Sequence, residues 1–61
     1  MEYTNSEIER RIEESIHSSR DRRIMHLRLV DGLTYEAIAE AVQMSAVQIK
    51  RIVKRYAMMI L

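Results

Sequence analysis

The chain has 61 residues, of which 48% are apolar and 31% are charged, with a formal net charge of +1, no cysteine, no proline and one glycine. A chain of this length forms one small domain, and without cysteine it has neither a disulfide nor a thiolate metal site. The N-terminal segment has no apolar run, so we expect neither a signal peptide nor a membrane-spanning helix.

Residues 5–17 are predicted to form the first helix. Thr4 and Glu7 have the spacing of a capping box, in which each side chain bonds a backbone N–H at the helix start. An apolar stripe of one residue in every four follows, formed by Ile8, Ile12 and Ile16. Ser18 and Ser19 indicate a break and the cap of the next helix.

A second helix is predicted over about residues 19–31. Its apolar residues point in nearly every direction around the helix, so we expect neighbours to contact it on several sides and the helix to be central. Asp31 and Gly32 should end it, since glycine adopts the left-handed conformation that closes a helix.

Two further helices are predicted over about 34–41 and 45–58, with Thr34 and Ser45 as their N-caps. An apolar residue precedes each cap and another follows four positions later, which is the pattern of a hydrophobic staple. Only about three residues separate these helices, a connection that fits the corner of a helix-turn-helix. Ala39 provides the small residue at the crossing, and the inner faces have Ile38, Val42, Met44, Ile49 and Ile52. We therefore predict a single all-α domain over residues 1–61, a compact bundle of about four helices that contains a helix-turn-helix.

The last predicted helix separates its charges from its apolar residues. At about 100° per residue, one side carries Ile49, Ile52, Val53, Tyr56 and Ile60, and the opposite arc carries Val47, Lys50, Arg51, Lys54 and Arg55. From Asp31 to Met44 every charged residue is acidic, whereas every charged residue from Ser45 onward is basic. A solvated face usually mixes charge signs to form i,i+4 pairs, so this pattern favours a polyanionic partner over a merely soluble face.

The stretch RRIMHLRLVDGLTYEAIAEAVQMSAVQIKRIVKR resembles region 4 of bacterial sigma factors. It is still more similar to small stand-alone proteins with that domain from phages and mobile elements of Gram-positive bacteria. The resemblance covers about residues 20–57, and GLTYEAIAE is its most specific part. Gln43 departs from the pattern, because the family has glycine before the apolar residue of the turn. The resemblance implies a small transcriptional regulator that binds promoter double-stranded DNA, with helix 45–58 in the major groove.

The resemblance and the helical wheel together define the expected DNA-binding residues. Those expected to face the groove are Ser45, Ala46, Val47, Lys50, Arg51 and Lys54. Arg51 can pair bidentately with guanine, and Ala46 or Val47 can contact a thymine methyl. Thr34 and Tyr35 would approach a phosphate through their hydroxyls and the helix N-terminus. Backbone charge alone is expected from Arg55 and from Arg20, Arg22 and Arg23.

We predict no enzyme, no cofactor and no metal site. His17 and His26 do not share a helical face, and the serines fit helix caps better than nucleophiles. The expected location is the cytoplasm of a bacterial or phage-infected cell.

Two alternatives stay open at this stage. Met58 and Leu61 would point to the basic side, so the tail either frays, folds back on the core, or packs on a second copy in a homodimer. The rival function is a protein-interaction module that mimics a sigma domain and docks on RNA polymerase or another host protein without reading DNA.

Overall fold

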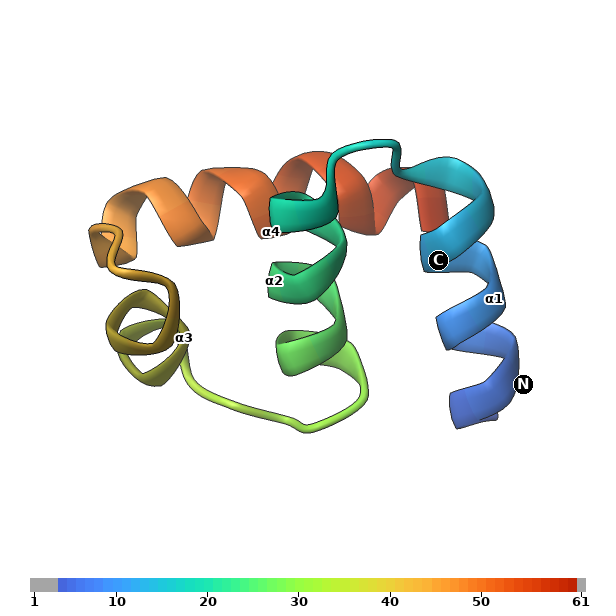
Figure 1. Cartoon of the computed structure of the whole chain (residues 1–61), viewed down its shortest axis with the longest axis horizontal. Helices are drawn as coiled ribbons and strands as arrows, with labels where there is room; N and C mark the ends of the chain where they lie inside the picture. The colour runs from blue at the N-terminus through green and yellow to red at the C-terminus, as the bar shows by residue number, and fades with distance from the viewer. Residues whose placement is uncertain (1–3, 61) are drawn as a thin grey trace.

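The fold consists of four helices joined by short connections (Figure 1). The computed structural model describes residues 4–60, and within them α1 spans Asn5–Ser15, α2 spans Ser19–Leu29, α3 spans Tyr35–Val42 and α4 spans Ala46–Ile60. No strand occurs in that range. The prediction of a compact all-α bundle of about four helices is therefore confirmed. No helix within residues 4–60 is long and apolar enough to cross a membrane.

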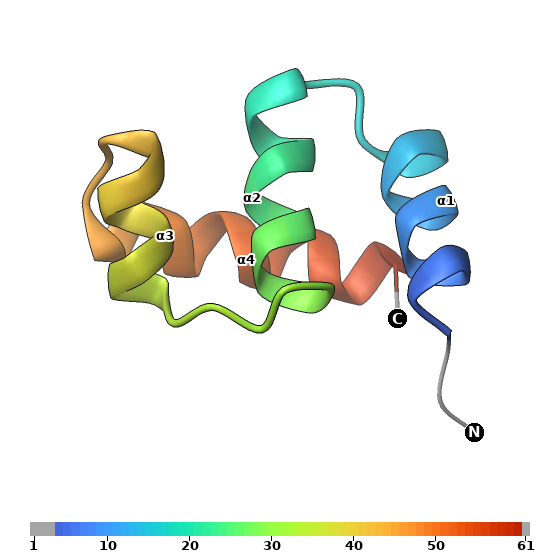
Figure 2. The ribbon, with the colours of Figure 1, turned by 60° about the horizontal axis from the view of Figure 1, so that its bottom comes forward.

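Helix α2 occupies the centre of the bundle, as its all-round apolar pattern predicts. It contacts α1, α3 and α4. Figures 1 and 2 show α1 and α3 at opposite ends of the long helix α4, with α2 between them. Helix α3 crosses α4, so the two ends of α3 lie on either side of α4. This crossing sets how the candidate binding residues at the start of α3 lie relative to those on α4.

Aliphatic side chains from all four helices form the core. Ile24 and Met25 of α2 are fully buried, which explains why an apolar pattern without a single face is stable here. Partly buried side chains surround them, including Leu27, Leu29 and Tyr56. The buried apolar set is Ile12, Ile16, Ile24, Met25, Ile38, Ala39, Ile49, Val53 and Ile60.

Hydroxyl side chains cap the starts of the first three helices. Thr4 Oγ1 accepts a hydrogen bond from the backbone N–H of Glu7 at 3.2 Å, and Ser18 Oγ accepts from Asp21 N at 3.3 Å. Thr34 Oγ1 accepts from Ala37 N at 3.1 Å. Each bond satisfies a backbone donor that has no partner within the helix. The predicted N-caps Thr4, Ser18 and Thr34 are therefore confirmed.

The helix ends differ from the predicted ones where a tertiary contact determines the backbone. Helix α1 ends at Ser15 instead of residue 17, because Ile16 is extended (φ −117°, ψ 119°) and fully buried. Helix α2 ends at Leu29 instead of residue 31, and Gly32 then takes the predicted left-handed conformation (φ 71°). Helix α4 runs to Ile60 rather than residue 58, since the Ile60 side chain is buried and its carbonyl accepts a 3.3 Å bond from Arg11 Nη1.

Candidate nucleic-acid interface

Helix α4 has one buried side and one cationic side. Ile49, Val53 and Ile60 are buried in the core, and Ile52 and Tyr56 are partly buried beside them. The residues of the opposite arc, Val47, Lys50, Arg51, Lys54 and Arg55, are all exposed. The four cations have no acidic residue of their own helix between them, because α4 contains no Asp or Glu. The packing of α4 thus matches the helical wheel, and its charged side faces away from the protein.

The corner between α3 and α4 is closed by a residue in a left-handed conformation. Gln43 has φ 57° and ψ 49°, and its backbone N–H bonds the Ala39 carbonyl. The N–H of Met44 bonds the same carbonyl at 3.0 Å. A non-glycine residue in this conformation costs about 1 kcal/mol. The turn therefore keeps its geometry despite the absence of glycine, at the expense of some stability.

Ser45 starts α4 through a complete capping box with Gln48. The N–H of Gln48 donates to Ser45 Oγ at 3.2 Å, and the N–H of Ser45 donates to Gln48 Oε1 at 3.2 Å. The Ser45 hydroxyl also donates to that Oε1 at 3.2 Å. Ser45 is exposed just before the first residue of α4, but its hydroxyl proton already bonds Gln48 Oε1. Its next neighbours differ in access, because Ala46 is half-buried whereas Val47 is 63% exposed.

The start of α3 presents a hydroxyl group beside the corner. Thr34 is exposed and accepts the capping bond from Ala37, which leaves its O–H able to donate to a ligand. Tyr35 is half-buried, and its ring lies under Arg28, with the guanidinium carbon 4.5 Å from the ring centroid. Arg28 Nη1 also donates to the Leu33 carbonyl at 2.9 Å. Arg28 thus fixes the loop and the ring that lead into α3, a role that sequence reasoning missed.

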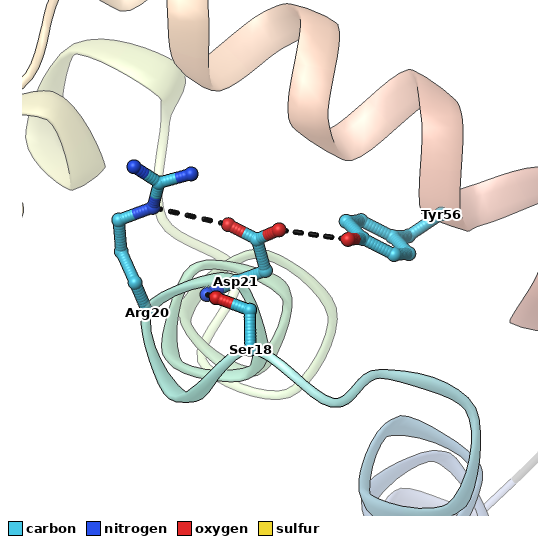
Figure 3. A network of polar contacts seen from close by, with 4 residues as sticks. All are labelled: Ser18, Arg20, Asp21 and Tyr56. Atoms are coloured by element: carbon cyan, nitrogen blue, oxygen red, sulfur yellow. Dashed lines mark hydrogen bonds and ion pairs between the residues drawn. The ribbon is translucent and has the colours of Figure 1, made fainter.

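The arginines at the start of α2 have three different environments. Arg22 bonds the backbone before α2: its Nε donates to the Ile16 carbonyl at 2.6 Å, and its Nη2 donates to the His17 carbonyl at 3.3 Å. Arg23 is exposed, and the structure gives it no hydrogen bond or ion pair within residues 4–60. Arg20 Nε donates to Asp21 Oδ1 at 3.1 Å (Figure 3). The sequence could not separate these three residues, because their contacts depend on the fold.

A buried carboxylate links α2 to α4. Asp21 is 6% exposed, and its Oδ2 accepts a 2.7 Å hydrogen bond from the Tyr56 hydroxyl. This bond raises the pKa of Tyr56 above 10.0, helped by burial and by the negative charge of Asp21, while Arg55 opposes the shift. Figure 3 shows Asp21 between Arg20 and Tyr56. The network bonds the inner side of α4 to α2 and leaves the cations of α4 exposed.

His26 lies between two acids that the sequence did not place near it. Its Nε2 is 3.4 Å from Glu9 Oε2, and its Nδ1 is 3.4 Å from Asp31 Oδ2. The two acids approach opposite nitrogens of the ring, so the three groups do not converge on one point. Within residues 4–60, no group of three or more His, Asp or Glu side chains is arranged to hold a metal ion.

A comparison with protein families places most of the chain in a known group. The model of the family described as a homeodomain-like domain matches residues 17–57. That range contains α2, α3 and most of α4, and α1 lies before it. No curated protein and no solved structure matched the chain.

Proposed function

The chain belongs to the family of homeodomain-like helix-turn-helix domains, and from this we propose that it is a small transcriptional regulator that binds specific double-stranded DNA with α4 in the major groove. A helix-turn-helix places its second helix in that groove. The sequence resemblance of residues 20–57 to sigma region 4, and to stand-alone phage and mobile-element proteins, supports a role at promoters. Such a regulator would act in the cytoplasm of a bacterial or phage-infected cell.

The observation that carries the proposal is the charge separation on α4. Lys50, Arg51, Lys54 and Arg55 are exposed on the arc opposite the buried Ile49 and Val53 side chains. Four neighbouring cations repel one another in the free protein, and a phosphate backbone relieves this repulsion while it releases condensed counterions. The proposed partner is therefore a nucleic acid duplex.

The proposed contacts follow from the position of each side chain. Arg51 and Val47 lie at the centre of the exposed arc, where we assign Arg51 to guanine and Val47 to a thymine methyl. Ala46 lies at the edge of this contact. Thr34 and Tyr35 hold a phosphate at the start of α3. The remaining proposed residues, Ser45, Lys50, Lys54 and Arg55, contact the backbone or the rim of the groove.

The test begins with selection of bound fragments from random duplex DNA, followed by measurement of affinity at several salt concentrations. Four to six phosphate contacts give a log–log slope of about −4 to −5. The double variant R51Q/K54Q should lower the affinity and reduce this slope by about 1, because Lys54 is assigned to the backbone and Arg51 to a base. The control R10Q removes a charge from an exposed position on α1 and should retain most of the affinity. A wild-type protein that binds no duplex, or that binds equally at about 50 and 200 mM salt, contradicts the proposal.

A second candidate function is docking on RNA polymerase as a sigma-domain mimic. The all-round apolar pattern of α2 no longer supports it, since Ile24 and Met25 are fully buried in the domain. The exposed methionines still support it, because Met58 is 89% exposed on α4. Binding of purified bacterial polymerase by R51Q/K54Q, together with no duplex binding by the wild type, would favour this function.

The same methionines support a homodimer as a further proposal. Helix α4 continues through Met58 and Met59 to the buried Ile60, so the end of the helix does not fray within the described residues; Leu61 lies outside them. Many DNA readers place two recognition helices one duplex turn apart. Sedimentation at micromolar concentration tests the dimer, and M58E should dissociate it. A wild type that sediments as a monomer both alone and on DNA rejects it.

A further inference from the structure

Arg20 is a surface arginine whose guanidinium is held in place at one edge. Its Nε donates to Asp21 Oδ1 at 3.1 Å, and its side chain is 60% exposed while that of Asp21 is 8% exposed. Within residues 4–60, its two terminal amino groups have no hydrogen-bond or ion-pair partner. Figure 3 shows these groups pointing away from the carboxylate. Two adjacent donors of a fixed guanidinium can bind a phosphate through two parallel hydrogen bonds.

Asp21, which holds Arg20, is itself fixed from two sides. Its Oδ2 accepts the 2.7 Å bond from the Tyr56 hydroxyl, and its backbone N–H donates to Ser18 Oγ at 3.3 Å. The carboxylate therefore cannot turn without breaking its bond to the Tyr56 hydroxyl. An arginine held in this way loses less rotational freedom on binding than one that moves freely.

Arg20 borders the end of α3 that lies farthest from Thr34. A surface hollow there is lined by Ser19, Arg20, Arg23, Ala41, Val42 and Gln43. Thr34 precedes the other end of α3, and eight helical residues span about 12 Å. The major groove is about 12 Å wide. Because α3 crosses α4 (Figures 1 and 2), a helix α4 seated in the groove places the two ends of α3 over opposite walls of that groove.

We propose that Arg20 binds a backbone phosphate on the wall of the major groove opposite the one contacted by Thr34 and Tyr35. The inference rests on the proposed function and adds to it a phosphate contact on the second wall of the groove. The other arginines of α2 do not fit this role. Arg22 is bonded to the Ile16 and His17 carbonyls. Arg23 lines the same hollow, but no hydrogen bond or ion pair within residues 4–60 holds its guanidinium in place for two parallel bonds.

The experiment compares R20Q with R10Q, which removes the same charge from an exposed position on α1, at the opposite end of α4 from α3. Both are measured on one duplex selected by the wild type, at a temperature where circular dichroism shows each variant folded. R20Q should weaken binding about 5- to 10-fold at about 0.1 M salt and reduce the salt slope by about 0.9. R10Q should change the affinity less than 2-fold and leave the slope unchanged.

A scan of the duplex with single neutral methylphosphonates locates the contact. In the wild type, neutral groups on both walls should weaken binding. R20Q should become insensitive at one phosphate, and T34V should become insensitive at a phosphate on the other wall. Equal effects of R20Q and R10Q, or loss of sensitivity on the same wall for R20Q and T34V, overturn the Arg20 contact alone. A wild type that binds no duplex overturns the proposed function as well.

Discussion

The Tyr56 hydroxyl donates a 2.7 Å hydrogen bond to Oδ2 of Asp21, across 35 positions of the chain. This bond joins the inner side of α4 to the start of α2, and through Asp21 it reaches Arg20. It is a charged bond to a buried acceptor, since Asp21 is 6% exposed. The orientation of the cationic helix therefore depends on this polar contact in addition to its aliphatic packing.

We predict that Asp21→Ala lowers the free energy of unfolding by about 1.5–3 kcal/mol, the range for hydrogen bonds to a charged group. Tyr56→Phe should act in the same direction, because it leaves a buried carboxylate oxygen without its partner. The double variant should be little worse than Asp21→Ala alone, since both changes remove the same bond. Urea unfolding followed by circular dichroism measures all three. Glu40→Ala, an exposed acid of α3, is the control and should stay within about 0.5 kcal/mol of the wild type.

The same bond predicts a loss of stability at alkaline pH. The pKa of Tyr56 in the folded protein lies above its ordinary value of 10.0, chiefly because of the bond to Asp21. A raised pKa means that the folded state favours the protonated phenol, so its contribution to stability is complete below pH 10.0 and is lost as the pH rises through the folded pKa. The difference in unfolding free energy between wild type and Tyr56→Phe should therefore stay constant up to pH 10.0 and shrink as the pH rises above it. A difference that does not shrink above pH 10.0 argues against the bond.

Local patterns predicted the helix starts, and long-range contacts explain what they missed. The caps at Thr4, Thr34 and Ser45 each bond a group three residues away. Their spacing in the sequence is therefore enough to predict them. The end of α1 depends on the burial of Ile16 against other helices, and no local signal indicates it.

The exposure of the charged side chains on α4 was also predictable from a local pattern. The periodicity of α4 gives its exposed arc, because the helix has 3.6 residues per turn and one clear apolar side. The different environments of Arg20, Arg22 and Arg23 were not predictable, since each depends on a partner that only the fold provides. The acids beside His26 were missed for the same reason, because Glu9 comes from another helix.

Gln43 and Gly32 both have a left-handed backbone conformation, and their substitution should change the free energy of unfolding in opposite directions. Gln43→Gly should raise the free energy of unfolding by about 0.5–1 kcal/mol, because glycine adopts φ 57° without the strain of a side chain. Gly32→Ala should lower it by about 1 kcal/mol. A Cβ at Gly32 would meet no atom within 4 Å, so this loss reports backbone strain alone. Thermal unfolding of the two variants beside the wild type tests the pair. A loss of stability in Gln43→Gly would mean that the turn is not left-handed.

Arg28 and Tyr35 should be energetically coupled, because the guanidinium lies 4.5 Å from the ring centroid. Arg28→Met keeps most of the side-chain volume but removes the charge over the ring and the 2.9 Å bond to the Leu33 carbonyl. We expect it to lower the free energy of unfolding by about 1–2 kcal/mol. A double-mutant cycle with Tyr35→Leu separates the two contributions, since only the ring contact is shared, and the coupling should be about 0.5–1 kcal/mol. Arg10→Met, at an exposed position on α1, controls for the loss of a surface charge. If the coupling is zero while Arg28→Met remains destabilising, then the bond to Leu33 alone holds the loop, and Tyr35 is placed at the start of α3 by packing rather than by the arginine.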